Sequence, residues 1–408
     1  MAGYSYWSSS VLSRIGYETN RALRVNDPVG SSSAQVRANI NVGYRLEDRW
    51  VEAGADLAST RYPGDSDQSS DDFGLSLRGG LEFEHGVAGL NLRAVHDSSL
   101  SSEAGPGGTG LVSVRVPRSA FTLAPFWRRE LNEDTAVSAS YRFQAVRFDE
   151  DADTPLADSD AHGLQFGLQR TLDERTQFQL TLQADRLVAY DTPRARRQQT
   201  SNLAGFAGIS HAFSERATLG VDIGLARLRS DYSDVVLIGP SPFGFGLVQY
   251  RNPVTGEVLV GPAGATPGRV DSSIEPDVGL RYVARLDLEG ERWQAGFSVG
   301  RIGTPLSTGD VAVDDTLSGT LRWDMSERER LETSLDLSRR TEDSTGLAAS
   351  GGREYVAFGI GYVRELSEQL SFAAAYDFVQ QSFDSGGGTA RSHGVFATFT
   401  YRWDARPL

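Results

Sequence analysis

The chain has 408 residues, of which 44 are glycine and none is cysteine, and its 54 acidic and 40 basic residues give a net charge of −14. The absence of cysteine excludes a disulfide framework, a zinc–thiolate site and a catalytic thiol. A membrane-spanning helix needs about 20 consecutive apolar residues, and the apolar runs here are far shorter. The acidic balance argues against a nucleic-acid partner, since phosphate binding favours a basic surface.

A chain of this length would ordinarily form two or three soluble domains of about 150 residues each, joined by linkers. No linker or shift in composition marks such a boundary, so we expect residues 1–408 to form a single domain. The first residues resemble neither the basic nor the apolar part of a signal peptide. For an exported protein, we expect that the signal peptide has been removed.

Apolar and polar residues alternate along most of the chain, which is the period of β-strands. The first clear run covers residues 36–44, where Val36, Ile40 and Val42 alternate with polar side chains. Similar runs follow at residues 73–83, 177–185 and 317–325. Each predicted strand therefore has one apolar face and one strongly polar face.

The connections between these runs alternate between short polar turns and long loops rich in glycine, serine and aspartate. Several short turns resemble one another and recur at intervals of 41 residues, as from Leu131 to Leu172 and from Leu172 to Phe213. This repeat indicates a series of β-hairpins. Eight short turns predict about 18 antiparallel strands in up-and-down order, with both chain ends on the short-turn side.

Alternation alone does not distinguish a membrane barrel from a soluble β-sandwich. The distribution of tryptophan does, because five of the six lie near a short turn or the C-terminus, where membrane barrels carry an aromatic girdle. Trp7 is the exception. The final run alternates up to Trp403, as the last strands of outer-membrane barrels do. We therefore predict an all-β transmembrane antiparallel barrel in the bacterial outer membrane, in contact with its lipid and lipopolysaccharide.

The longest loop covers about residues 235–272 and is rich in proline and glycine. We expect it to be extracellular. If it folds inward, it forms a plug or a constriction.

Two opening segments, Gly16–Asn20 and Asn26–Gly30, and the repeated Leu-Ser/Thr-Glu/Asp-Arg turns resemble a family of bacterial outer-membrane β-barrels, the β-barrel porins often encoded in exopolysaccharide export clusters. The resemblance extends over nearly the whole chain. It implies a conduit or export partner for a polysaccharide, together with periplasmic export partners, and it transfers no functional residue.

The polar phase of the strands predicts the side chains that line the lumen of such a barrel. Arginine, amide and carboxylate side chains offer several hydrogen bonds to hydroxyl-rich or carboxylated sugars. Taken singly, each of these side chains is also explained as simple solvation of a wet lumen. The predicted pore-lining residues are Arg37, Asn39, Arg78, Glu82, Arg93, Arg142, Gln165, Gln179, Arg281, Arg285, Arg322 and Asp336.

We expect no enzyme, cofactor or metal site. The segment Gly296–Gly300 fits the G-x-S-x-G pattern of serine hydrolases, but it lies in an alternating strand, whereas the nucleophile elbow needs a sharp turn into a helix. Acidic clusters at residues 65–72 and 149–160 have carboxylates that can bind divalent ions, but lack the order of a calcium loop. We interpret them as solvated charge.

A barrel of about 18 strands leaves an aqueous lumen unless loops fill it. The predicted function is therefore a conduit across the outer membrane, for the export of a polysaccharide in the first place. One alternative is a diffusion porin for small solutes, and another is a plugged structural or adhesive surface barrel. A third alternative is an outer-membrane hydrolase.

Overall fold

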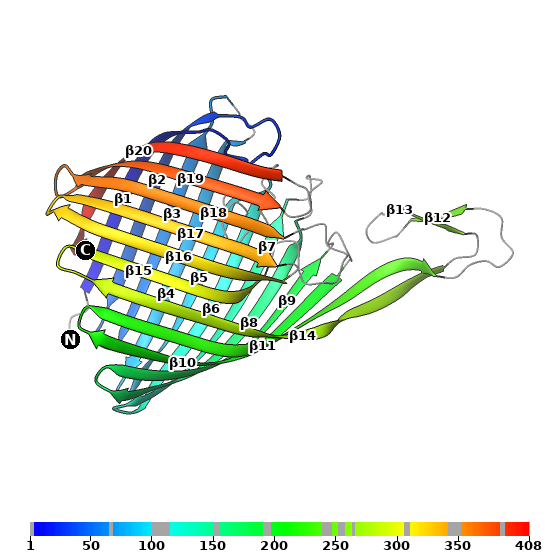
Figure 1. Cartoon of the computed structure of the whole chain (residues 1–408), viewed down its shortest axis with the longest axis horizontal. Helices are drawn as coiled ribbons and strands as arrows, with labels where there is room; N and C mark the ends of the chain where they lie inside the picture. Colours follow the sequence, from blue (N-terminus) through cyan, green and yellow to red (C-terminus); the bar gives the residue numbers. More distant parts are fainter. Residues whose placement is uncertain are drawn as a thin grey trace.

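The computed structural model describes residues 4–64, 68–99, 115–149, 156–190, 197–238, 247–251, 258–262, 266–305, 311–341, 352–383 and 388–407. Eighteen strands form one antiparallel sheet, in which β1 pairs with β2 on one side and with β20 on the other. The sheet is therefore closed, and the prediction of an 18-stranded up-and-down barrel is confirmed (Figure 1). No helix among the described residues is long and apolar enough to cross a membrane.

The strands of the barrel are β1 (Tyr4–Glu18), β2 (Ser31–Arg45), β3 (Arg49–Arg61), β4 (Ser70–Phe83), β5 (Gly86–Ser98), β6 (Pro117–Asn132), β7 (Thr135–Phe148), β8 (Asp158–Asp173), β9 (Thr176–Tyr190), β10 (Arg197–Ser214), β11 (Ala217–Ile238), β14 (Thr266–Glu289), β15 (Trp293–Pro305), β16 (Val311–Ser326), β17 (Glu329–Thr341), β18 (Arg353–Glu365), β19 (Leu370–Phe383) and β20 (Gly388–Pro407). A separate two-stranded sheet contains β12 (Leu247–Arg251) and β13 (Val258–Pro262).

The two phases of each strand lie on opposite sides of the barrel wall. Apolar side chains such as Val36, Ile40 and Leu182 are exposed on the outside. Exposed apolar side chains over the whole circumference of a closed sheet are what a lipid-facing surface requires. The polar phase faces inward and meets solvent in the lumen.

The short turns lie at one rim, called here the short-turn rim, where both chain ends also lie (Figure 1). Each turn accepts a backbone hydrogen bond from the next hairpin. Thr171 N donates to Asp134 O at 2.7 Å, and Ala212 N donates to Arg175 O at 2.8 Å. These donors are 41 residues apart. The sequence repeat thus corresponds to equivalent hairpins that stack turn against turn.

For two tryptophans the structure differs from the sequence prediction of an aromatic girdle: Trp7 belongs to the girdle and Trp50 does not. Trp7 pairs with Val42 near the start of β1, which begins at the short-turn rim, so it belongs to the outward aromatic band. Trp293 and Trp323 pair directly in the same band. Trp50 instead shares the inward phase, because it pairs with Arg45 and Gly80. Parity along the strand, rather than distance from a turn, decides which side a tryptophan faces.

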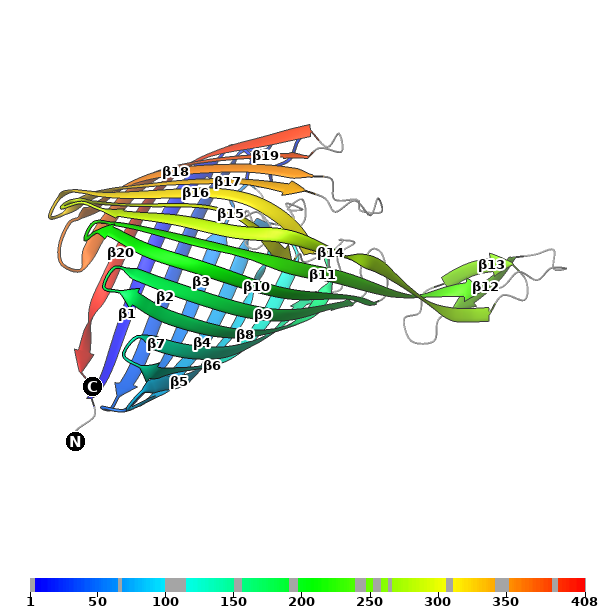
Figure 2. The same ribbon diagram turned by 60° about the horizontal axis from the view of Figure 1, so that its bottom comes forward.

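The predicted long loop at residues 235–272 is largely strand. β11 and β14 continue as a paired ribbon up to Ile238 and Thr266, and β12 pairs with β13 beyond it. Both views show these strands projecting away from the opposite rim, called here the long-loop rim (Figure 2). The described part of this hairpin therefore lies outside the barrel and does not form an inward plug.

Candidate solute path through the barrel

The inner wall is identified by a cavity that contacts same-face residues of several consecutive strands. Arg142, Gly163, Asp185 and Asn202 are successive neighbours across β7 to β10 and line one cavity together. Side chains converge in this way only on the concave side of a closed sheet. The polar phase of the strands therefore faces the lumen.

All twelve residues predicted to line the pore lie on this inward phase of their strands. Their part in a solute path stays a prediction. Seven of them are joined to other side chains by the hydrogen bonds or ion pairs described. These contacts are Arg78 Nη2 to Glu52 Oε1 at 2.8 Å, Asn39 Nδ2 to Asp56 Oδ1 at 2.8 Å, Arg45 Nη2 to Glu82 Oε1 at 3.1 Å, Arg142 Nη2 to Gln144 Oε1 at 2.8 Å, Arg322 Nε to Asp324 Oδ1 at 3.4 Å, Arg285 Nη1 to Asp222 Oδ2 at 3.3 Å, and Gln179 Nε2 to Asp222 Oδ1.

Two of the twelve are cations that have neither a hydrogen bond nor an ion pair within the described part of the chain. Neither Arg37 on β2 nor Arg93 on β5 has an ion-pair partner among the residues that the structure describes. Because a guanidinium is always charged, both add uncompensated positive charge to the lumen. Arg281 differs from the rest in being buried, with Nη1 donating to Leu280 O at 3.2 Å.

A glycine allows one of the polar ladders to form. Gln179 on β9 reaches Asp222 on β11 across Gly208 of the intervening β10. A side chain at Gly208 would overlap both residues. Arg285 on β14 continues the ladder from Asp222. A guanidinium, a carboxylate and an amide are thus presented in a row across four strands.

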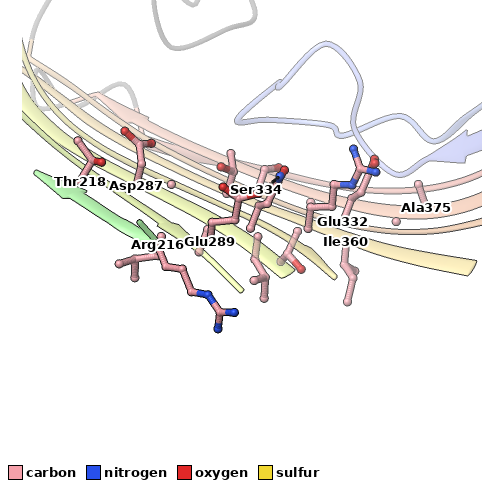
Figure 3. A pocket seen from close by; sticks show the side chains of 18 of the residues that line it. Arg216, Thr218, Asp287, Glu289, Glu332, Ser334, Ile360 and Ala375 are labelled. Carbon is pink, nitrogen blue, oxygen red and sulfur yellow. Dashed lines mark hydrogen bonds between the residues drawn. The ribbon is translucent and has the colours of Figure 1, made fainter. Parts of the chain in front are cut away.

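Near the short-turn rim the inner wall is hollowed to about 690 Å³. Its floor is a row of small residues that pair across neighbouring strands, namely Gly296, Thr320, Ser334 and Gly359. Figure 3 shows Asp287 and Ser334 on one side of the ribbons and Ile360 on the other. The carboxylates of Asp287, Glu289, Glu332 and Asp377 and the guanidinium of Arg322 surround the row. The hollow thus has a floor of small residues with charged side chains around it.

The first long loop, residues 19–30, lies against the inner wall at the long-loop rim and is called here the inner loop. Leu23 is buried against Ala390 of β20, with Val25 and Val379 packed beside them. Ala390 and Val379 both lie on the inward phase, in register with Gln381 and Ser392 respectively. The inner loop therefore narrows this mouth of the barrel.

Specific contacts fix the conformation of the inner loop. The Asn20 side chain donates to Arg24 O at 2.8 Å and accepts from Arg24 N at 2.9 Å. Leu23 adopts a φ of 46°, which is unfavourable for a branched side chain and persists only where packing compensates. Arg21 stacks on Tyr62 at 4.4 Å and pairs with Glu18. Burial lowers the pKa of Arg21, and Glu18 opposes this effect.

From the sequence, residues 235–272 were the candidate for an inward plug or constriction, because they form the longest loop and are rich in proline and glycine. The structure places the inner loop at the inner wall instead. A signal for it was present in Ala22, Leu23 and Val25, which are apolar residues in an otherwise polar connection. Apolar side chains in a loop are more stable when they pack against other apolar residues than when they are exposed to water.

The hydrolase-like segment Gly296–Gly300 lies within β15, as the alternation predicts. The hydroxyls of Ser298 and Ser318 form a hydrogen bond of 2.8 Å between β15 and β16. The Ser298 hydroxyl is therefore part of the polar inner wall. Of the acidic clusters, Asp65, Asp67 and residues 150–155 lie outside the described residues.

No protein-family profile matches the sequence, and no curated protein matches it either. Solved structures do match over nearly the whole chain. The closed form of the ferric-catecholate import receptor Fiu from E. coli K12 has a TM-score of 0.51 at 10% identity, covering 97% of this chain and 82% of that chain. Its open form has a TM-score of 0.50 at 10% identity, covering 97% and 81%. OccK5 (OpdH) from Pseudomonas aeruginosa has a TM-score of 0.49 at 10% identity, covering 98% and 99%.

At such low identity these likenesses concern the fold alone. The two Fiu structures carry the comparison, and the closed sheet, the lipid-facing apolar phase and the aromatic band agree with it. The chain has the fold of the β-barrels of the bacterial outer membrane and is located in that membrane.

Proposed function

We propose that the protein is a channel through which hydrated polar solutes cross the outer membrane. One observation carries this proposal. Charged side chains that point into the barrel are half exposed to solvent: 57% for Arg285, 54% for Arg78 and 45% for Arg322. Side chains inside a filled barrel would be buried, so their exposure supports a lumen that holds water.

The solute that we propose first is a hydroxyl-rich one, an exported polysaccharide. Support comes from the ladder of Gln179, Asp222 and Arg285, because an amide, a carboxylate and a guanidinium together donate to and accept from sugar hydroxyls. A polymer would need periplasmic partners to deliver it. The short-turn rim is the side that faces the periplasm in outer-membrane barrels, and the hollow floored by Gly296 and Ser334 opens there.

Diffusion of small solutes is the second candidate. It is favoured by the unpaired cations Arg37 and Arg93, which attract small anions into a lumen without any partner. In this reading the inner loop sets the size limit at the outer mouth.

Liposome swelling tests the proposal and separates the two candidates. Purified protein is reconstituted into liposomes, which are diluted into isotonic solutions of mono-, di- and oligosaccharides. Swelling that falls off with sugar size is expected for a water-filled lumen narrowed by the inner loop. Swelling with monosaccharides alone would favour a small-solute porin. If no sugar causes swelling, either in the intact protein or after removal of residues 21–29, the channel proposal is wrong.

A further inference from the structure

The outer side of the barrel wall carries the same five kinds of residue twice. Each set combines a tyrosine and a phenylalanine two residues apart on one strand, a histidine directly opposite the phenylalanine on the next strand, and an arginine bonded to a glutamine. The first cluster is Tyr141, Phe143, His162, Arg186 and Gln199 on β7 to β10, and the second cluster is Tyr376, Phe378, His393, Arg391 and Gln380 on β19 and β20.

The two clusters share their geometry as well as their composition. The tyrosine hydroxyl lies 2.7 Å from Nδ1 of His162 in the first cluster and 2.8 Å from Nδ1 of His393 in the second. The centres of the phenylalanine and imidazole rings are 5.0 and 5.1 Å apart. The arginine donates to the glutamine Oε1 at 2.7 and 2.9 Å. The clusters lie far apart on the closed sheet, with β11 and β14–β18 between them on one side and β1–β6 on the other.

Both clusters face away from the lumen. In the first, Gly163 and Asp185 line the lumen, so alternation along the strands turns the side chains of His162 and Arg186 outward. The wall is a single sheet, so the backbone of these two residues also borders the lumen cavity. In the second, Asp377 lines the hollow in the inner wall, so its neighbours on β19 and their partners on β20 face outward.

The clusters lie at the outer edge of the apolar membrane layer. Phe143 and Phe378 each lie eight residues beyond the start of their strand at the short-turn rim. Arg186 lies ten residues beyond the start of β9, and Arg391 pairs with the residue ten beyond the start of β19. At about 3.3 Å per residue and a tilt of about 45°, the phenylalanines lie about 19 Å and the arginines about 23 Å above this rim. Since the apolar band is about 25 Å tall, lipid headgroups begin at this level.

The arginines of the clusters have no carboxylate partner, whereas other outward arginines near this level do. Such ion pairs are Arg61 with Asp71 at 2.8 Å, Arg147 with Asp160 at 2.7 Å and Arg301 with Asp315 at 3.8 Å. Within the described part of the chain, Arg186 and Arg391 donate only to a neutral glutamine. Arg227 on β11, two strands from Arg186, has no described partner and adds positive charge beside the first cluster. Because a guanidinium is always charged, each cluster presents uncompensated positive charge to the membrane.

The histidine places a second donor beside each guanidinium. His162 pairs directly with Arg186 across β8 and β9, and His393 lies two residues from Arg391 on β20. When the tyrosine hydroxyl donates to Nδ1, the imidazole carries its proton on Nε2, which has no hydrogen bond among the described residues in either cluster. A guanidinium and an N–H side by side match the several oxygens of a phosphate group.

The wall below each cluster, toward the short-turn rim, is apolar. Leu164 and Leu203 beside the first cluster are 40% and 62% exposed, and Val395 beside the second is 57% exposed. A ligand that meets both the donors and this surface is an amphiphile with a phosphate in its headgroup. A free phosphate ion would leave the apolar side chains without a partner.

We propose that each cluster binds one phosphorylated glycolipid of the outer leaflet, of the lipopolysaccharide class. The phosphate accepts hydrogen bonds from Arg186 and His162 Nε2 in the first cluster, and from Arg391 and His393 Nε2 in the second. The acyl chains lie along the apolar side chains below. Both sites face the membrane, so they exist or fail independently of the axial channel.

Native mass spectrometry tests the proposal on full-length protein refolded in detergent, which carries no lipopolysaccharide, with diphosphorylated lipid A as the probe. Arg186→Gln and Arg391→Gln each remove the guanidinium of one cluster and are combined in a double variant. Arg301→Gln is the matched control, because it removes an outward guanidinium that pairs with Asp315 and lowers the net charge equally. Lipid A without its phosphates tests whether the phosphate is recognised.

We expect two lipid A molecules on the native chain and on Arg301→Gln, one on each single variant, and at least tenfold weaker binding to the double variant and of the dephosphorylated lipid. His393→Phe, which keeps Arg391, should weaken binding to the second cluster severalfold. Equal binding to the native chain and the double variant would overturn the proposal, as would an equal loss in Arg301→Gln or equal binding of the dephosphorylated lipid. Sugar-induced liposome swelling, measured on the same variants, reports on the axial channel independently.

Discussion

Two adjacent carboxylates on β16 point to opposite sides of the wall and have very different surroundings. Asp314 accepts two hydrogen bonds from Arg340, at 2.9 and 3.1 Å, and both side chains are nearly buried inside the barrel, at 3% and 6% exposure. Asp315 faces outward, 3.8 Å from Arg301, and both are about 40% exposed. Removing one partner of a buried pair leaves an uncompensated charge, whereas removing an exposed partner costs little.

We therefore expect Asp314→Asn to lower the free energy of unfolding by about 3 kcal/mol, the lower end of the range for a buried pair because asparagine still accepts one hydrogen bond. Asp315→Asn should lower it by less than about 1 kcal/mol. The double change of Asp314→Leu with Arg340→Met should recover most of the loss. Urea unfolding in lipid vesicles, followed by tryptophan fluorescence, measures all three. Equal effects of the two asparagine variants would refute the assignment of β16 residues to the inside and the outside.

Three further changes test the lumen and its mouths. Leu23→Ala removes burial worth about 2 kcal/mol from the inner loop, so the open state should gain about 30-fold over the closed one, seen as more frequent or larger current steps. Unchanged currents would mean that the inner loop does not narrow the mouth. Arg37→Glu with Arg93→Glu should shift the reversal potential in a salt gradient toward cation selectivity, while Arg301→Glu on the outer face should not. Deletion of residues 239–265 should leave conductance as it is, because the described strands around them project outward, and a larger conductance would show that this segment obstructs the lumen.

The barrel was predictable because its determinants are local and repeated. A strand that separates lipid from water needs alternation, and a hairpin series needs regularly spaced turns, so residues 36–44 and the 41-residue repeat carry the architecture by themselves. Alternation also placed Arg78, Asp336 and the other predicted residues on one phase.

The features that escaped prediction depend on contacts between distant residues. Leu23 meets Ala390 and Val379 only after the barrel closes through β1 and β20. The ladder between β14 and β15 ends at Tyr282 and Arg301, and this end point depends on how the two strands pair, which the sequence of either strand alone does not show. The sequence left Trp7 out of the girdle and included Trp50, because only the distance from a turn was considered. In the structure, strand phase and the closure of the barrel place Trp7 on the outside and Trp50 on the inside.

Single-channel recording of the intact protein in a planar bilayer tests the central claim, that the lumen is a water-filled passage. The account predicts discrete current steps, larger or more frequent in Leu23→Ala, and transient block when an oligosaccharide is added from the short-turn side. Silence from both the intact protein and Leu23→Ala, with folding confirmed by the urea transition, would contradict it and leave a closed surface barrel.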